Sequence, residues 1–374
     1  MCGIAGFCNG EFDWRRNIER MNERMYHRGP DASGIWASED ERVVFGHRRL
    51  SVVDLTPGGA QPMKSNNNRY IIAYNGEIYN YQDLKEKLIR EKKVTAFRGT
   101  SDTEVLLEAV SAYGLEETLR MSKGMFAIAL YDQRERVLYL VRDRIGEKPL
   151  YYGFVGKTFV FASDLNSIAC LDTFHNPINR GILDTYFRYG YIPAPYSVYE
   201  NIYKLEPGKI LKIQAPFQDF EITAYWSVKD TALYGQEHPF RGSEQEAAEE
   251  LERLLKCAIR GQMVADVPVG AFLSAGIDSS TIVSLMQSLS ERKVRSFTIG
   301  MCEKDYNEAE IARKIAAHLG TEHTELYITE EDAKRVIPRL GTMFGEPFAD
   351  SSQIPTCLVS KLTREHVTVS LSGD

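Results

Sequence analysis

The pattern of hydrophobic and polar positions along this 374-residue chain changes between its two halves. In the first half, short apolar runs bounded by turn residues predict the strands of an antiparallel sheet. These strands are Met1–Phe7, Val43–Arg48, Tyr70–Tyr74, Met125–Asp132, Val137–Arg142 and Phe159–Ser163. Two predicted helices, Tyr81–Glu91 and Ser101–Tyr113, interrupt them, and Ser101 with Glu104 has the spacing of a capping box. We therefore expect an α+β domain rich in antiparallel sheet.

From Ser243 onward, apolar segments of helix length alternate with segments of strand length. Ser243 and Glu246 predict another capping box, which opens a helix that runs to about Gln262. The following elements are predicted in order: strand Val267–Leu273, helix Ser279–Leu289, strand Val294–Ile299, helix Asn307–Leu319, strand Thr324–Ile328, helices near Glu331–Phe344 and Ser352–Thr363, and strand Val367–Leu371. This alternation predicts a parallel, doubly wound α/β sheet, which binds ligands at the carboxyl ends of its strands.

Prolines and weak patterning mark the region between the two halves. Pro193, Pro195 and Pro207-Gly208 lie in a stretch without clear periodicity. We expect a first domain at residues 1–214, a linker at 215–242 and a second domain at 243–374. The sequence stops at Asp374, just past a predicted strand with no following helix. The second domain is therefore expected to be incomplete.

Composition and charge narrow the classes of function. The chain is 43% hydrophobic and 26% charged, and its 45 Lys and Arg against 52 Asp and Glu give a net charge of −7. This balance, without a basic and aromatic stretch, disfavours a nucleic-acid partner. No apolar run approaches the roughly 18 residues that a membrane span needs, so we expect a cytoplasmic protein with no membrane partner. The six cysteines are far apart and form no CxxC, which disfavours a zinc site or a disulfide framework.

Cys2 directly follows the initiator methionine, in the run Met1-Cys2-Gly3-Ile4-Ala5-Gly6. Removal of Met1, which we expect before so small a side chain, would leave a thiol and a free α-amino group on one residue. An α-amine with a reference pKa of about 7.7–8.0 is a suitable base at neutral pH and can activate a thiol. Taken alone, the position also fits a small buried cysteine that opens an edge strand. The rest of the chain has to decide between the two interpretations.

A second chemical signal follows the predicted strand Val267–Leu273, in the run Ser274-Ala275-Gly276-Ile277-Asp278-Ser279-Ser280. A turn of small residues between a strand and a helix presents backbone N–H groups to an anion, which predicts phosphate binding. No lysine follows the glycine, so the loop is not that of P-loop NTPases. Asp278 would repel phosphate unless Mg²⁺ bridges them, which makes it a candidate metal ligand. The same residues would also serve as an ordinary helix N-cap.

Together these motifs resemble the glutamine-dependent asparagine synthetases over essentially the whole chain. The segments that carry the resemblance are Met1–Gly6, His27–Asp31, Gly46–Asp54, Tyr74–Asn80, Ser101–Glu104, Gly124–Ala127, Arg142–Gly146, Lys148–Tyr151, Ser274–Ser280 and Ser372–Asp374. The resemblance implies an N-terminal-nucleophile hydrolase sandwich followed by an ATP-pyrophosphatase domain. It also implies glutamine, ATP and aspartate as small-molecule partners, Mg²⁺ as a cofactor, and a homodimer as a candidate assembly.

Within the first domain, the resemblance assigns residues to a glutamine pocket. Cys2 is implied to attack the side-chain amide of glutamine, while Asn75 and Gly76 form the oxyanion hole. Arg49 is implied to bind the α-carboxylate and Asp102 the α-ammonium group. The remaining pocket residues implied are Leu50, Ser51, Val52, Val53 and Glu77. Individually, Asn75-Gly76 also fits a hairpin turn, Asp102 a first helical turn and Arg49 a solvated strand position, but their occurrence beside Cys2 favours the pocket.

Within the second domain, the resemblance implies an ATP site. Its residues are Leu273, Ser274, Gly276, Asp278, Ser279, Ser280, Ile299, Ser372 and Gly373, of which Leu273 and Ile299 would contact the adenosine. Asp374 has the position of an acidic residue tied to acyl-adenylate formation. Ala275 departs from the family pattern, which most often has glycine there. A positive φ at this position would strain its methyl group.

The predicted function is ATP-dependent amide synthesis with glutamine as the nitrogen donor. Ammonia released at Cys2 would attack an acyl-adenylate, most simply β-aspartyl-AMP, and give asparagine, AMP and pyrophosphate. One alternative is a paralogue that amidates a sugar uronate or a natural-product carboxylate. Another is a non-catalytic scaffold, against which stands the joint presence of Cys2, Arg49, Asn75 and Asp102.

Overall fold

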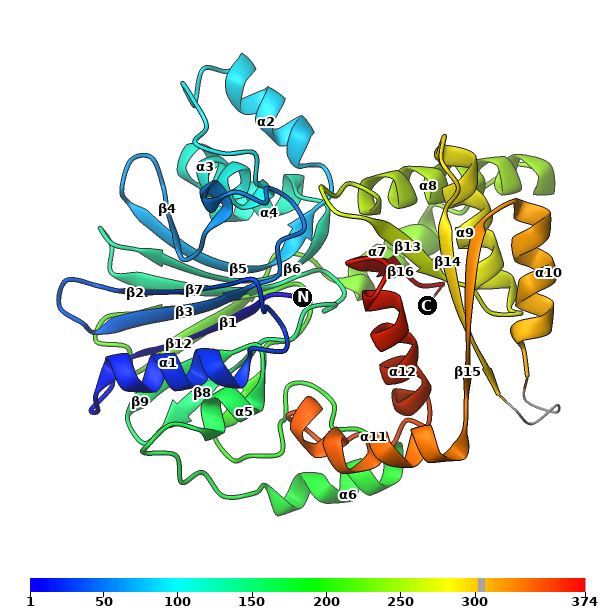
Figure 1. Ribbon diagram of the computed structural model, residues 1–374. Helices are drawn as coiled ribbons and strands as arrows, with labels where there is room; N and C mark the ends of the chain where they lie inside the picture. Colours follow the sequence, from blue (N-terminus) through cyan, green and yellow to red (C-terminus); the bar gives the residue numbers. More distant parts are fainter. Residues whose placement is uncertain (302–306, 374) are drawn as a thin grey trace. The chain divides into compact units, whose positions relative to one another are not determined.

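Two six-stranded sheets form the first unit of the chain, Met1–Glu237 with Phe344–Ala349. The computed structural model describes residues 1–301 and 307–373 (Figure 1). In strand order, one sheet has β10 (Ile202–Lys204), β8 (Tyr151–Val155), β9 (Thr158–Ala162), β1 (Gly3–Cys8), β3 (Val43–Arg49) and β2 (Ala32–Ala37); the other has β12 (Phe220–Ala224), β11 (Lys209–Gln214), β7 (Val137–Arg142), β6 (Gly124–Asp132), β5 (Tyr70–Ile78) and β4 (Met63–Lys64). Neighbouring strands are antiparallel.

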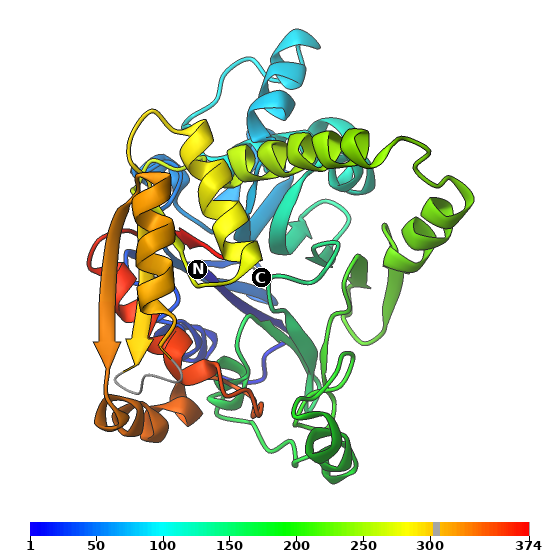
Figure 2. The ribbon, with the colours of Figure 1, turned by 90° about the vertical axis from the view of Figure 1, so that its right-hand side faces the viewer.

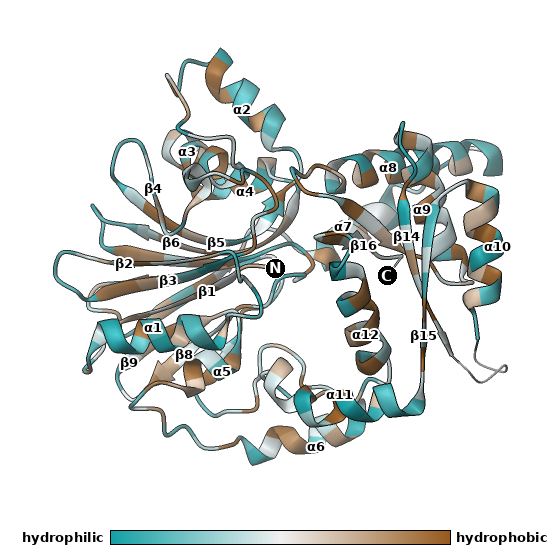
Figure 3. Ribbon diagram, viewed as in Figure 1, coloured by the Kyte–Doolittle hydropathy of each residue, from teal (hydrophilic) through white to brown (hydrophobic). Residues whose placement is uncertain are grey.

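The two sheets pack face to face, and helices cover their outer faces. Apolar side chains of both sheets, such as Phe45, Phe161 and Leu140, share one buried cluster. The outer face of the first sheet packs on α1 (Trp14–Arg24) and α5 (Leu165–Ala169), and that of the second on α2 (Tyr81–Arg90), α3 (Asp102–Tyr113) and α4 (Leu115–Met121). Figure 3 shows hydrophilic residues along the outer side of α1. The expected α+β N-terminal-nucleophile hydrolase sandwich is confirmed.

Two local expectations in this unit are wrong, and both fail because tertiary partners intervene. Strand β5 does not stop at Tyr74: it continues to Ile78, and Asn75-Gly76 pairs with Phe126 and Ala127 of β6 instead of turning. The capping box at Ser101 is only half formed. Ser101 Oγ accepts from Glu104 N at 3.2 Å, but the Glu104 carboxylate accepts from the backbone N–H groups of Arg98 and Gly99.

A four-stranded parallel sheet organises the second unit, His238–Met343 with Asp350–Asp374. Its strand order is β15 (Glu322–Ile328), β14 (Arg295–Met301), β13 (Val269–Phe272) and β16 (Val369–Leu371). The helices are α8 (Glu244–Gln262), α9 (Ile277–Leu289), α10 (Ala309–Leu319), α11 (Glu330–Met343) and α12 (Gln353–Arg364), and α8 begins with the complete capping box expected at Ser243. Helix α10 and helix α12 lie on opposite sides of the strands (Figures 1 and 2).

The strand order of this sheet reverses between β13 and β16. The chain runs outward from β13 through β14 to β15, and then returns to add β16 on the other side of β13. This reversal is the switch point of a doubly wound sheet, and ligands bind to such sheets at the carboxyl ends of the strands beside the switch point. The predicted parallel α/β architecture is confirmed.

Two segments depart from the expected division of the chain into two halves joined by a linker. Residues 215–242, predicted as a linker, include β12 and α7 (Val228–Glu237). Residues 344–349 lie between α11 and α12 in the sequence but belong to the first unit. There the Glu346 carboxylate accepts from Val198 N at 2.8 Å and forms an ion pair with Lys204.

None of the described helices is long and apolar enough to cross a membrane.

Candidate active sites

Cys2 lies just before β1, against the residue that follows β3. Its Sγ accepts from Leu50 N at 3.4 Å and lies 3.6 Å from Leu50 O. Arg28 Nε donates to Cys2 O at 3.1 Å, which fixes the backbone of the nucleophile. Burial raises the pKa of the Cys2 thiol, so the neutral thiol dominates at pH 7. Attack by this sulfur therefore requires a base that removes the proton.

The N-terminal amine is suited to be that base. Burial lowers the pKa of the Met1 amino group from 8.0 to about 6, so the amine is mainly neutral at pH 7. A neutral amine has a free lone pair and can accept a proton. Removal of Met1, which remains a prediction, would place such an amine on Cys2 itself.

Asn75 carries a buried amide with an unused donor. Its side chain is 1% exposed, and Nδ2 has no hydrogen-bond partner in the described part of the chain. Such a group is costly in the free protein and can be satisfied by a ligand oxygen. At Gly76 an added Cβ would lie 2.2 Å from Met125 O, so only glycine fits between β5 and β6. Asn75 Nδ2 is thus a donor available to a ligand, and the oxyanion hole predicted at these two residues remains a prediction.

Arg49, the last residue of β3, organises the loop that follows it. Its Nη1 donates to Thr56 O at 3.0 Å, and its Nη2 donates to Asp54 O. Ser51 N donates to Asp31 Oδ2 at 2.8 Å and tethers the start of the same loop. The guanidinium therefore supports residues 50–53, which were predicted to line the glutamine pocket. Its predicted contact with a substrate carboxylate remains a prediction.

Asp102 connects α3 to the end of β5. Its Oδ2 accepts from Tyr74 Oη and from Ile78 N, both at 2.9 Å. Burial raises the pKa of Asp102, and burial together with the Asp102 charge raises the pKa of Glu77 to about 7. Lys148, also buried, opposes the shift at Glu77. Two carboxyl groups in buried surroundings provide an environment that attracts an ammonium group.

We expect the KM for glutamine to rise as the pH falls through about 7. The raised pKa means that Glu77 is protonated below this pH, so the pocket loses a negative charge that attracts the α-ammonium group. The Glu77→Gln protein should have a higher KM that no longer changes with pH across this window. The exposed α4 variant Glu116→Gln should keep the wild-type dependence. A wild-type KM that is constant from about pH 6 to about 8 would contradict this assignment.

A pocket of about 300 Å³ lies at the carboxyl ends of the parallel strands, at the switch point. It is lined by Phe272, Leu273, Ser274, Gly276, Asp278, Ser279, Phe297, Thr298, Ile299, Glu308, Pro355, Thr356, Val359, Ser372 and Gly373. Eight predicted ATP-site residues are in this set. Ser280 does not line the pocket, and its hydroxyl donates to Gly276 O at 2.7 Å within the first turn of α9. Asp374 lies outside the described residues.

Sequence reasoning missed the lining residues that come from helices. Thr356 and Val359 belong to α12, and Glu308 precedes α10, so only the packing of these helices brings them to the strand ends. Phe297 and Thr298 could have been found, because they directly precede Ile299 at the end of the same predicted strand.

The loop after β13 is held in shape by its own serines. Ser274 Oγ lies 2.8 Å from Ser279 Oγ and accepts from Gly276 N at 3.1 Å. Ala275 does not have a positive φ, so its methyl group is not strained where the family usually has glycine. Ala275 N donates to Glu308 Oε2 at 3.3 Å. This loop N–H thus already binds a carboxylate oxygen, in keeping with a preference for anions.

The pocket offers two carboxylates, Asp278 and Glu308, for a divalent cation. Within residues 1–301 and 307–373, no group of three or more His, Cys, Asp or Glu side chains could hold a metal ion. A cation here would need phosphate and water oxygens as further ligands. That incomplete set of protein ligands fits Mg²⁺, which typically binds through one or two carboxylates and substrate phosphates.

Comparisons with known proteins match each half of the chain to a protein family. A glutamine amidotransferase domain family matches residues 1–226, and an asparagine synthase family matches residues 250–374. The whole chain is 35% identical to a putative glutamine-hydrolysing asparagine synthetase 2 of Methanocaldococcus jannaschii and 35% identical to glutamine-hydrolysing asparagine synthetase 1 of Bacillus subtilis. It spans 74% and 57% of their respective lengths.

Among solved structures, a glutamine phosphoribosylpyrophosphate amidotransferase from B. subtilis, complexed with ADP and GMP, is similar in part. It is 16% identical with a TM-score of 0.47, and the match covers 88% of this chain and 91% of that one. The sequence relationship to the two synthetases is the stronger finding, since it covers this chain from end to end. The chain therefore belongs to the family of glutamine-hydrolysing asparagine synthetases.

Proposed function

We propose that this chain hydrolyses glutamine at Cys2 and uses the ammonia for ATP-dependent amidation of aspartate. The observation that carries the proposal is the buried Asn75 amide, which has a free donor in the candidate glutamine site containing Cys2. The serine-rich loop at the switch point of the parallel sheet supports the ATP-dependent half. Because the chain spans between 57% and 74% of the length of the relatives described, the complete synthetase reaction belongs to the proposal.

In the first half-reaction, the neutral N-terminal amine takes the thiol proton while Cys2 Sγ attacks the side-chain carbonyl carbon of glutamine. The carbonyl oxygen becomes an oxyanion that accepts from Asn75 Nδ2 and from the Gly76 N–H, each donor contributing roughly 3–4 kcal/mol. The protonated amine then gives its proton to the leaving nitrogen, the C–N bond breaks and ammonia departs. Water hydrolyses the thioester and releases glutamate. Arg49 and Asp102 would orient the amino-acid end of the substrate.

In the second half-reaction, an oxygen of the aspartate side-chain carboxylate attacks the α-phosphorus of ATP and pyrophosphate leaves. Backbone N–H groups of the loop at Ser274–Ser279 and the N-terminus of α9 would hold the pyrophosphate. Asp278, with phosphate oxygens, would hold Mg²⁺, which when bound offsets the charge of the phosphates. Ammonia then attacks the acyl carbon of β-aspartyl-AMP, and AMP leaves as asparagine forms. Leu273 and Ile299 would contact the adenosine.

An assay with different carboxylate substrates tests whether aspartate is the compound that is amidated. With ATP, Mg²⁺ and glutamine present, aspartate should stimulate pyrophosphate release, and asparagine should form in equal amount. The Asp278→Asn protein should lose at least about tenfold of this turnover, because a charged contact to the metal is removed. Asp230→Asn, on the exposed helix α7, is the matched control. If aspartate does not stimulate pyrophosphate release but a sugar uronate does, the paralogous amidotransferase is favoured instead.

A further inference from the structure

His47 is a polar residue on the face of β3 that otherwise presents apolar side chains to the core. Along β3 it alternates in step with Val43 and Phe45, whose side chains lie in the cluster between the two sheets. The residue is only 1% exposed. A buried imidazole is costly unless it is hydrogen-bonded, and His47 Nε2 lies 3.1 Å from the carbonyl oxygen of Tyr74 in β5. His47 therefore joins the first sheet to the second by a hydrogen bond.

The contact with a carbonyl determines which nitrogen of His47 carries the proton. A carbonyl oxygen only accepts hydrogen bonds, so Nε2 is the donor. Burial lowers the pKa of His47 to about 4, and the nearby Arg49 charge acts in the same direction. The imidazole is therefore neutral at pH 7, with its single N–H directed at the Tyr74 carbonyl. At this nitrogen the ring is a fixed donor to the backbone and has no lone pair to accept a proton.

The backbone groups of β5 alternate between two sides of the strand. Gln133 N donates to Arg69 O at 2.9 Å and Tyr79 N donates to Lys123 O at 2.7 Å, at the two ends of the pairing between β5 and β6. The odd-numbered residues of β5 thus direct their N–H and C=O groups toward β6. Because successive residues of an antiparallel strand point these groups to opposite sides, the even-numbered residues direct theirs away from β6. Gly76 belongs to this second set.

Side chains replace a strand partner along this second side, because β4 pairs with β5 only before Tyr74. Tyr74 N donates to Gln61 Oε1 at 2.6 Å, and Ile78 N donates to Asp102 Oδ2 at 2.9 Å. The Gly76 N–H lies between these two donors and points to the same side. No side chain in the described part of the chain accepts from it. The Gly76 N–H is therefore available to a ligand oxygen, as is the Asn75 amide.

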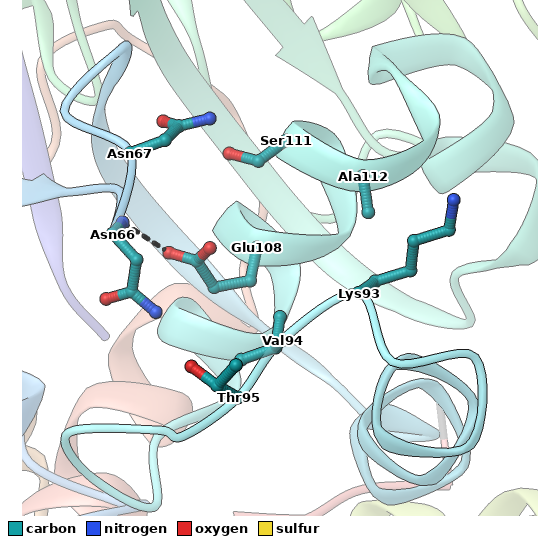
Figure 4. A pocket seen from close by; sticks show the side chains of 8 residues that line it. All are labelled: Asn66, Asn67, Lys93, Val94, Thr95, Glu108, Ser111 and Ala112. Carbon is teal, nitrogen blue, oxygen red and sulfur yellow. Dashed lines mark hydrogen bonds between the residues drawn. The ribbon is translucent and has the colours of Figure 1, made fainter.

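Helix α3 anchors the segment that leads to this edge of β5. Gln61 Nε2 donates to Thr103 Oγ1 at 3.3 Å, in the first turn of the helix. Later on the same helix, Glu108 Oε1 accepts from Asn66 N at 2.7 Å, beside a pocket of about 410 Å³ that both residues line (Figure 4). The N–H of Tyr74 is thus fixed from the side of α3. Its carbonyl is fixed from the first sheet, by His47.

We propose that His47 is a positioning residue for glutamine hydrolysis, which holds the Tyr74 carbonyl so that Asn75 Nδ2 and the Gly76 N–H converge on the oxyanion. This role rests on the proposed function, since the oxyanion forms only when Cys2 attacks glutamine. The Tyr74 carbonyl and the Asn75 N–H belong to one planar peptide group, which β6 binds on one side and His47 on the other. Loss of the His47 donor would free one side of this plane, directly before both oxyanion donors.

The test compares two substitutions of His47 by glutaminase kinetics of the full chain. His47→Met has a similar volume but no donor, whereas His47→Gln places an amide NH₂ group near the position of Nε2. We expect His47→Met to lower kcat by about 10- to 10²-fold with KM nearly unchanged, because a small misplacement of catalytic groups has effects of this size. His47→Gln should retain most of the wild-type kcat. Titration of Cys2 with an electrophilic glutamine analogue counts the competent sites, so partial unfolding is not mistaken for slow turnover.

Thr118→Val is the matched control for loss of a buried bond to a carbonyl. Thr118 is buried, and its Oγ1 donates to Gly114 O at 2.8 Å in α4, away from the residues assigned to glutamine. This variant should be less stable in thermal unfolding but keep the wild-type kcat. Equal losses of kcat in His47→Met and His47→Gln, or a rise in KM alone, would overturn the role of His47. A wild-type chain that releases no glutamate would instead overturn the proposed function, whereas an active wild type with an equally active His47→Met protein would overturn only the role of His47.

Discussion

The Cys2→Ala protein is expected to release no measurable glutamate from glutamine, while its use of free ammonia persists. Removal of a covalent nucleophile typically lowers turnover by at least about 10⁴-fold. Cys2 Sγ, which lies just before β1 and against Leu50, is the sulfur proposed to make the attack, and alanine removes it. The assay follows glutamate release with glutamine, and pyrophosphate release with an ammonium salt in its place.

The matched control is Cys257→Ala, since Cys257 is an exposed cysteine of α8. It should hydrolyse glutamine at the wild-type rate. Continued glutamate release by the Cys2→Ala protein would remove Cys2 from the role of nucleophile. Loss of both glutamine-dependent and ammonia-dependent turnover would show that Cys2 also supports the ATP-dependent reaction, contrary to the separate tasks proposed for the two sites.

The Asn75→Ala protein is expected to lose about 10²- to 10³-fold in kcat for glutamine hydrolysis, with little change in KM. The free Nδ2 would bind the oxyanion of the intermediate more strongly than the carbonyl oxygen of the substrate, so its loss raises the barrier of the chemical step. The same observation predicts a small effect on stability, because the deleted donor has no partner in the free protein. Glutaminase kinetics and thermal unfolding measure the two effects separately.

Asn75→Asp sharpens this test. It preserves the shape of the side chain but replaces the donor by an acceptor, so kcat should fall at least as far as in Asn75→Ala. Ammonia-dependent turnover should be unchanged in both proteins. A kcat within about twofold of the wild-type value in Asn75→Ala would exclude the oxyanion role, since the loss of one such donor ordinarily has a far larger effect.

The order of strands and helices could be predicted where the hydrophobic pattern of the sequence reflects which side chains each element buries. The parallel unit follows from alternating apolar segments, and the reciprocal cap at Ser243 forms as its spacing indicates. The local signal at Asn75-Gly76 is typical of a turn, yet both residues lie inside β5, because pairing with β6 supplies hydrogen bonds that a turn would give up. Likewise, the Glu104 carboxylate does not complete the expected capping box, because it accepts from Arg98 Nε and from Gly99 N instead.

The residues of the candidate ATP site could be predicted where they lie at or just after the ends of predicted strands. Leu273, Ile299 and Gly373 come together because parallel strands end at one edge of the sheet. Glu308 and Thr356 reach the same pocket through helices, whose approach depends on how each packs on the sheet. The absence of strain at Ala275 also required the backbone, because the residue name does not reveal the sign of φ.

The ion pair between Lys204 and Glu346 has a practical meaning for anyone who wants to study the glutaminase unit alone. A fragment cut after Glu237 would contain Lys204, whose side chain is only 16% exposed, but would lack its carboxylate partner. It would also lose the acceptor for Val198 N. The polypeptide boundary and the folding boundary therefore differ, and a faithful fragment has to include the distant peptide 344–349, supplied either in trans or through a grafted connection.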